Sequence, residues 1–94
     1  MTYRLTRTAA EDVRRVYRES KRLFGAKQAG IYHQYLQSIF EMLSENPEAA
    51  RERAEISPPV RVHPCGMHLV VYVKTDDESV LVLRVRHARE NWTS

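Results

Sequence analysis

The chain has 94 residues, a formal net charge of +3 at pH 7 and a single cysteine. This length allows one hydrophobic core, so we expect a single domain over residues 1–94, and 43% hydrophobic residues exclude a disordered chain. One cysteine excludes an internal disulfide, and no stretch reaches the ~20 apolar residues of a membrane helix. No secretory leader is recognisable at Met1, so we expect a cytoplasmic protein without membrane contact.

The first predicted elements are a short strand and a helix. Residues 3–6 alternate in the manner of a strand. Thr8 and Glu11 form a capping box that predicts the start of a helix there, and Gly25 is suited to end it in a left-handed conformation. The outer face of this helix is basic, with Arg14, Arg15, Arg18 and Arg22.

A second helix is predicted from residue 26 to residue 46, because the residue before Pro47 disfavours helical dihedrals. The short connection at Gly25 makes the two helices an antiparallel hairpin. Its apolar stripe consists of Ala29, Tyr32, Leu36, Ile39 and Leu43. Residues 48–59 are polar and predict a loop, with one short helical turn over residues 48–53.

The last third of the chain predicts an antiparallel meander of three strands. These strands cover residues 60–63, 67–74 and 79–86. Pro64-Cys65-Gly66 forms the first turn, and residues 75–78 form the second. The expected architecture is therefore α+β: an N-terminal strand and an antiparallel helix hairpin packed on a small antiparallel sheet.

Both long strands of this meander are apolar on both faces. Val70 and Tyr72 lie on one face of the middle strand, and the alternation of the last strand places Leu81, Leu83 and Val85 together on one face. The helix hairpin can cover only one face of so small a sheet. The other face therefore needs a partner, or it remains an exposed apolar patch.

The sequence argues against a cofactor, a metal ion or covalent catalysis. The three glycines are far apart, so there is no phosphate-binding loop. His63, Cys65 and His68 lack a fourth zinc ligand nearby. His63 or His68 could serve as a base for Cys65, but a thiol in such a turn is more often incidental. The acidic cluster at residues 76–78 is typical of a hairpin turn.

The chain ends in a basic and aromatic segment: Arg84, Arg86, His87, Arg89 and Trp92. Cations at the end of a buried strand favour an anionic or macromolecular partner. For RNA cleavage, His87 could act as acid or base, but the partner group is less obvious because no tyrosine follows Tyr72, so the catalytic set is only half complete. The structural alternative for Arg84 is a salt bridge to Glu41 or Glu45.

The order of these elements resembles the ParE/RelE toxin superfamily. Residues 66–72 (GMHLVVY) are similar to its G-x-H-x-x-x-Y strand, and residues 83–89 (LRVRHAR) resemble the ending R-V-x-H-x-R of its ParE branch. The resemblance implies a bacterial type II toxin without enzymatic activity, which inhibits DNA gyrase by binding and is neutralised by a ParD-like antitoxin in a heterotetramer or larger complex. It implies no sequence-specific contact with nucleic acid.

The basic ending is accordingly the candidate surface for gyrase. The candidate antitoxin contacts are Arg14, Arg18, Arg22, Tyr32, Tyr35, Val70 and Tyr72. Two alternatives remain open at this point: a ribosome-dependent mRNA endonuclease of the RelE kind, from which the chain departs because it lacks a late tyrosine, and a non-toxic module that only binds an antitoxin.

Overall fold

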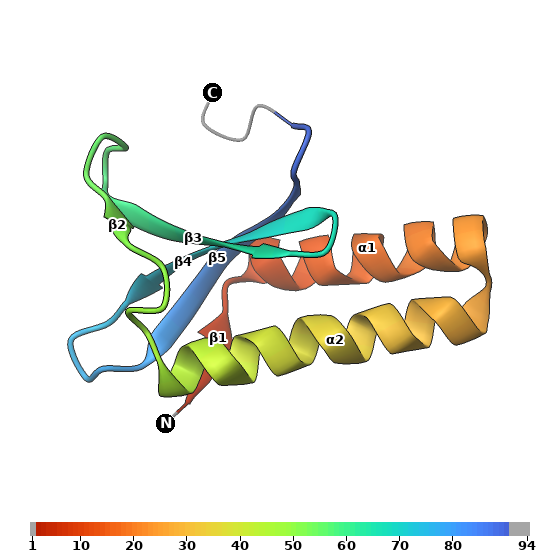
Figure 1. Cartoon of the computed structure of the whole chain (residues 1–94), viewed down its shortest axis with the longest axis horizontal. Coiled ribbons are helices and arrows are strands. Elements are labelled where there is room, and N and C mark those ends of the chain that lie inside the picture. The colour runs from red at the N-terminus through yellow and green to blue at the C-terminus, as the bar shows by residue number, and fades with distance from the viewer. Residues whose placement is uncertain (1, 91–94) are drawn as a thin grey trace.

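The computed structural model of the chain describes residues 2–90, and it consists of a helix hairpin packed on one five-stranded sheet (Figure 1). The elements are β1 (Tyr3–Leu5), α1 (Arg7–Phe24), α2 (Ala26–Glu45), β2 (Glu52–Arg53), β3 (Val60–Cys65), β4 (His68–Lys74) and β5 (Val80–His87). The predicted α+β class, hairpin and meander are confirmed. Neither α1 nor α2 has the length and apolarity of a membrane-spanning helix.

The sheet is mixed, with strand order β1-β5-β4-β3-β2. β3, β4 and β5 form the predicted antiparallel meander. β1 adds a parallel pair, since Tyr3 and Leu5 align with Val80 and Val82. The first and last strands of the chain are therefore neighbours, and the helix hairpin is the connection that follows β1.

Two local expectations about the chain before the meander were wrong. α1 begins at Arg7, earlier than predicted. Its N-cap is Thr6 and not Thr8, because the Thr6 hydroxyl accepts a hydrogen bond from the Ala9 amide at 3.0 Å. The predicted helical turn over residues 48–53 is absent, and Glu52 and Arg53 instead pair with β3. Gly25 does separate the two helices, at φ 89°.

The turn between β3 and β4 is also shifted relative to the prediction. Pro64 and Cys65 belong to β3 and pair with Leu69 and His68, so the turn consists of Gly66 and Met67. Proline fits this strand because its missing amide donor is tolerated at the edge of a sheet.

A β-bulge in β5 sets which residues face the helices. Tyr72 aligns with Val82 but Val71 aligns with Arg84, so Leu83 is the extra residue. The bulge reverses the alternation, and Val85 joins Val80 and Val82 in the core instead of lying with Leu81 and Leu83. The prediction for Val85 was therefore wrong. The core under the hairpin contains Ala9, Val16, Leu36, Phe40, Leu43, Cys65, Val70, Tyr72, Val80, Val82 and Val85.

The helix hairpin is longer than the sheet that it covers. Figure 1 shows the end where α1 passes into α2 projecting beyond the strands. Leu23, Phe24 and Ile31 near this end are 58%, 63% and 51% exposed. On the opposite face of the sheet, Val60, Val62 and Val71 form a smaller apolar cluster. The projecting end of the hairpin thus leaves apolar surface uncovered.

Candidate functional site

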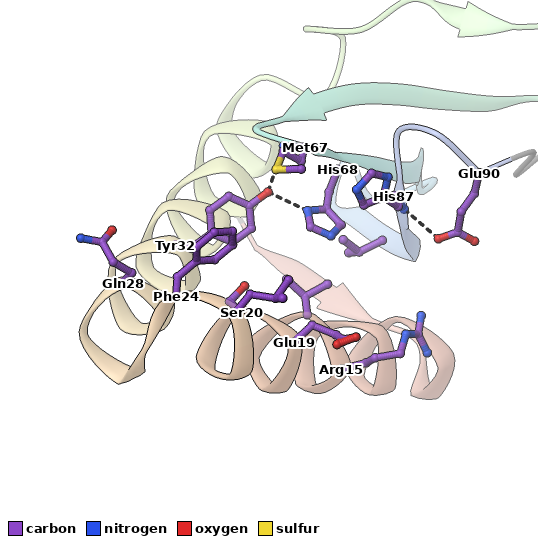
Figure 2. A pocket seen from close by; sticks show the side chains of 13 residues that line it. Arg15, Glu19, Ser20, Phe24, Gln28, Tyr32, Met67, His68, His87 and Glu90 are labelled. Atoms are coloured by element: carbon purple, nitrogen blue, oxygen red, sulfur yellow. Dashed lines mark hydrogen bonds between the residues drawn. The ribbon is translucent and has the colours of Figure 1, made fainter.

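An open groove of about 610 Å³ lies between the projecting hairpin and the end of the sheet. Figure 2 shows Phe24 and Tyr32 toward one end of it, Arg15 and Glu90 toward the other, and His68 and His87 side by side between them. The groove is lined by Arg15, Val16, Glu19, Ser20, Leu23, Phe24, Gln28, Tyr32, Met67, His68, Val85, His87 and Glu90. Most of this lining is apolar, which is typical of a site for another molecule.

Tyr32 anchors one wall of the groove. Its hydroxyl donates to the Cys65 carbonyl at 2.9 Å, accepts from the Met67 amide at 3.2 Å, and lies 2.6 Å from His68 Nδ1. Gly66 makes this approach possible, because a Cβ there would lie 2.7 Å from the Tyr32 hydroxyl. Burial raises the pKa of Tyr32, so the phenol remains a neutral donor.

His68 and His87 occupy opposed positions of β4 and β5, and their ring centroids are 5.3 Å apart. Burial, and next the neighbouring His87, lowers the pKa of His68 below its ordinary value. The Glu90 carboxylate accepts from the His87 amide at 3.0 Å and also binds Arg86. These contacts hold the end of β5 against the groove.

A buried carboxylate lies beside the groove. Asp12 is 1% exposed, and it accepts hydrogen bonds from Arg15, from Arg84 Nε at 2.8 Å and from the Val85 amide at 2.9 Å. Burial alone would raise the pKa of Asp12, but these hydrogen bonds together hold it below its ordinary value. Since β1 pairs with β5 only up to Val82, the Asp12 carboxylate supplies a partner for the Val85 amide, which has no β1 neighbour.

The predicted gyrase-binding residues differ in their surroundings. Arg84 binds Asp12, and not Glu41 or Glu45 as the sequence suggested. Arg86 pairs with Glu90, His87 lines the groove, and Arg89 is exposed. Trp92 lies outside the described residues.

The predicted antitoxin contacts divide in a similar way. Arg14, Arg18 and Arg22 are exposed on α1. Tyr32 lines the groove, and Tyr35, which is 45% exposed, packs against the Tyr32 ring. Val70 and Tyr72, however, are fully buried beneath the helices. Tyr72 donates its hydroxyl to the Pro47 carbonyl at 2.9 Å. The proposal that Val70 and Tyr72 contact an antitoxin was therefore wrong, because the hairpin itself covers that face.

The remaining candidates from the sequence are Cys65, the acidic turn and the possible metal ligands. Burial raises the pKa of the Cys65 thiol to about 11, which disfavours a nucleophilic thiolate. Asp77 Oδ1 accepts from the Ser79 amide at 3.2 Å within the β4–β5 turn. Within residues 2–90, no three potential ligands gather in a geometry that could hold a metal ion.

Sequence reasoning missed the groove and the pairing of its two histidines. One available signal was Leu23-Phe24 directly before Gly25, since two adjacent apolar residues cannot both lie on one narrow helix stripe. The other was the antiparallel meander, which brings the start of β4 against the end of β5 and so places His68 opposite His87.

Comparison with known proteins gives a consistent family. Residues 3–92 match the family described as "ParE toxin of type II toxin-antitoxin system, parDE". The chain is 30% identical to Toxin ParE3 of Caulobacter vibrioides over 86 residues, which cover 92% of this chain and 85% of that protein. It is also 30% identical to Toxin ParE1 of the same bacterium over 89 residues, which cover 95% and 91% respectively.

The fold has a counterpart among solved structures. A chain of the structure titled "Chromosomal ParDE TA system from P. aeruginosa" matches with a TM-score of 0.76 and 21% sequence identity. The match covers 93% of this chain and 95% of that chain. The arrangement of hairpin and sheet described above is thus shared across a large sequence distance.

Proposed function

This chain belongs to the ParE toxin family of type II toxin–antitoxin systems, and we propose that it acts in the bacterial cytoplasm by binding DNA gyrase, without cutting nucleic acid itself. The observation that supports the absence of nuclease activity is that two arginines of β5 are already paired with carboxylates. Arg84 binds the Asp12 carboxylate and Arg86 binds that of Glu90. These guanidinium groups are occupied, so they are poorly placed to stabilise the charge of a phosphodiester under attack.

The proposed gyrase surface is the exposed margin that follows β5. Arg89 is exposed there, three residues after Arg86, whose guanidinium group is paired with Glu90 and whose side chain is 24% exposed. Positive charge at a surface attracts gyrase when that enzyme presents acidic groups or bound DNA, and it accelerates the encounter. Arg84 contributes by holding β5 in place, and Trp92, which we also expect to contribute, lies outside the described residues.

A supercoiling assay with purified toxin and gyrase tests this proposal. We expect inhibition of supercoiling and accumulation of cleaved DNA, both lost in the double variant Arg86→Ala and Arg89→Ala. The matched control is Arg7→Ala with Arg51→Ala, which removes the same charge at exposed positions at the start of α1 and just before β2. Arg89→Ala alone gives the answer if the loss of the Arg86–Glu90 pair unfolds the chain. Full inhibition by these variants would disprove the assigned surface.

We further propose that a ParD-like antitoxin neutralises the toxin by placing an apolar segment in the groove. Leu23, Phe24 and Met67 are each more than half exposed there, and their burial is favourable by about 25 cal/mol per Å² of apolar area. Much of that gain is offset when a flexible segment becomes ordered. The exposed arginines of α1, Arg14, Arg18 and Arg22, complement an acidic antitoxin.

One observation favours the endonuclease as a second candidate. The acid–base partner that His87 lacked in the sequence is present in the fold, because His68 lies opposite it. A translation extract separates the two functions. Cleaved mRNA with unaffected gyrase supercoiling would establish the endonuclease, and its rate should then collapse in His87→Ala. Normal growth on induction without the antitoxin, together with tight antitoxin binding, would instead indicate a non-toxic binding module.

A further inference from the structure

The two imidazoles of the groove have incomplete hydrogen bonding. His68 lies on β4 and His87 on β5, with ring centroids 5.3 Å apart, and both line the groove. Each Nδ1 atom has a partner: the Tyr32 hydroxyl for His68 and the Arg89 amide for His87. Neither Nε2 atom forms a hydrogen bond with any residue between 2 and 90. An occupant of the groove would therefore bury two polar atoms that need partners.

The surrounding hydrogen bonds assign the protons of the neutral rings. When the Tyr32 hydroxyl donates to the Cys65 carbonyl, His68 Nδ1 is the donor to the Tyr32 oxygen, and this is the tautomer on which the inference is built. This leaves His68 Nε2 as an acceptor. His87 Nδ1 accepts from the Arg89 amide at 3.1 Å, so its Nε2 carries the proton. A single proton added to His68 Nε2 would turn the pair into two donors.

The charges beside the pair are unbalanced. Asp12 supplies one negative charge to two guanidinium groups, those of Arg15 and Arg84. One positive charge is left over within this trio, and Arg15 lines the groove. The two carboxylates that line the groove have their own cations, since Glu19 pairs with Arg22 and Glu90 with Arg86. This end of the groove therefore favours an additional negative charge.

We propose that His68 and His87 together bind one carboxylate of the antitoxin segment in the groove, and thereby select an antitoxin that carries an acidic residue at that point. This inference rests on the proposed docking of an antitoxin in the groove. An antitoxin with an apolar residue there would bury the imidazole nitrogens without partners, and such a burial lowers affinity about 10-fold to 100-fold. The pair thus supplies specificity within a groove that is otherwise mostly apolar.

Proton uptake is the signature of this arrangement. In the free toxin, burial and the adjacent His87 keep the pKa of His68 low. A bound carboxylate opposes both effects and raises that pKa, so His68 takes up to about one proton as the complex forms. The titratable or charged groups that face the pair, from the two helices, from β3 and from the end of β5, are Arg15, Glu19, Tyr32, Cys65 and Glu90.

Isothermal titration calorimetry with the antitoxin of the adjacent reading frame measures this uptake. Titrations at pH 7.5 in phosphate and in Tris, whose ionisation enthalpies differ, give the number of protons bound. We expect His68→Asn to lose the uptake and about 10-fold in affinity, because asparagine keeps a donor for the Tyr32 oxygen but has no titrating nitrogen. His87→Phe should lose at least as much affinity, and it decides the matter if His68→Asn fails to fold.

The control variant Phe24→Ala removes apolar contact in the same groove. It should weaken binding while the proton uptake stays unchanged. If Phe24→Ala weakens binding but His68→Asn and His87→Phe leave affinity and proton uptake unaltered, the carboxylate site is refuted. The proposed docking of the antitoxin in the groove is then still supported. If Phe24→Ala has no effect on affinity, the antitoxin does not occupy the groove, and the proposed docking fails together with this inference.

Discussion

The two halves of the helix hairpin have the same amphipathic pattern but different surroundings. In the half that lies over the sheet, Leu36, Phe40 and Leu43 are 2% exposed or less. In the half that projects beyond the strands, Leu23 and Phe24 are more than half exposed. Apolar side chains at helical spacing therefore contribute to folding in one half, while in the other they form a groove for a partner.

This difference follows from the lengths of the elements. α1 and α2 have 18 and 20 residues, or about 27 and 30 Å. The strands cross beneath only part of that length, as Figure 1 shows. A helix longer than its own sheet must expose the remaining part of its stripe. Free energy gained from that part is available only when another molecule covers it.

The largest expected effect is a contrast between two leucines. Leu36→Ala should lower the free energy of unfolding by about 2–5 kcal/mol, because it leaves a cavity in the core. Leu23→Ala should change it by less than about 0.5 kcal/mol, since that side chain is largely in water. Urea unfolding followed by circular dichroism measures both. Similar losses in the two variants would mean that the hairpin end is packed in solution.

Affinity should show the opposite order. Leu23→Ala removes apolar contact from the groove, and we expect it to weaken antitoxin binding about 10-fold. Leu36→Ala should bind nearly normally under conditions in which it remains folded. An antitoxin that tolerates Leu23→Ala without loss would show that the projecting half serves another purpose.

The Asp12 carboxylate joins α1 to β5, and its removal should be nearly as costly as the core cavity. Asp12→Ala leaves the Val85 amide without its partner and Arg15 and Arg84 without their shared anion. Because both guanidinium groups can turn toward water, we expect a loss of about 2–4 kcal/mol rather than more. Urea unfolding again measures it. Asp12→Asn should lose less, because its amide oxygen still accepts from Val85.

Acid should reproduce part of this loss without a mutation. The pKa of Asp12 is lower in the folded chain than in the unfolded chain. Its contribution to the free energy of unfolding is therefore complete above the unfolded value of about 3.9 and is lost as pH falls through the lower folded value. Thermal unfolding between pH 5 and pH 2 should show a shallower decline for Asp12→Asn. Parallel profiles would mean that other carboxylates dominate.

Much of the fold could be predicted because its signals are local. Gly25 and Asn46-Pro47 mark the ends of α1 and α2 within one residue. The face of the sheet on which Val85 lies could not be predicted from alternation, since the bulge at Leu83 depends on how β5 packs against β4 and α1. The pairing of β1 with β5 joins residues more than 70 positions apart, and no local pattern encodes it.

The groove was less predictable than the fold for a related reason. Leu23 fits the same helical stripe as Val16, and only the position of the sheet decides that Val16 is covered and Leu23 is not. For the same reason, Val70 and Tyr72 were mistaken for surface residues. Which face of β4 is covered depends on the hairpin and not on the composition of the strand.

The smallest expected effect is a difference in chemical reactivity between two sulfur-containing side chains, Cys65 at the end of β3 and Met67 in the following turn. It requires no change in stability. Cys65 is fully buried and Met67, two residues later, is 56% exposed. With a pKa of about 11, only about one Cys65 thiol in a thousand is ionised at pH 8, which makes alkylation by iodoacetamide about 100-fold slower than in the unfolded chain. Dilute peroxide should oxidise Met67 readily, because its exposed thioether is accessible. Mass spectrometry after each treatment locates the modification.

Antitoxin bound in the groove should protect Met67 from oxidation and leave the slow alkylation of Cys65 unaltered. Rapid alkylation of Cys65 in the free toxin would show that the part of the hairpin over the sheet opens in solution.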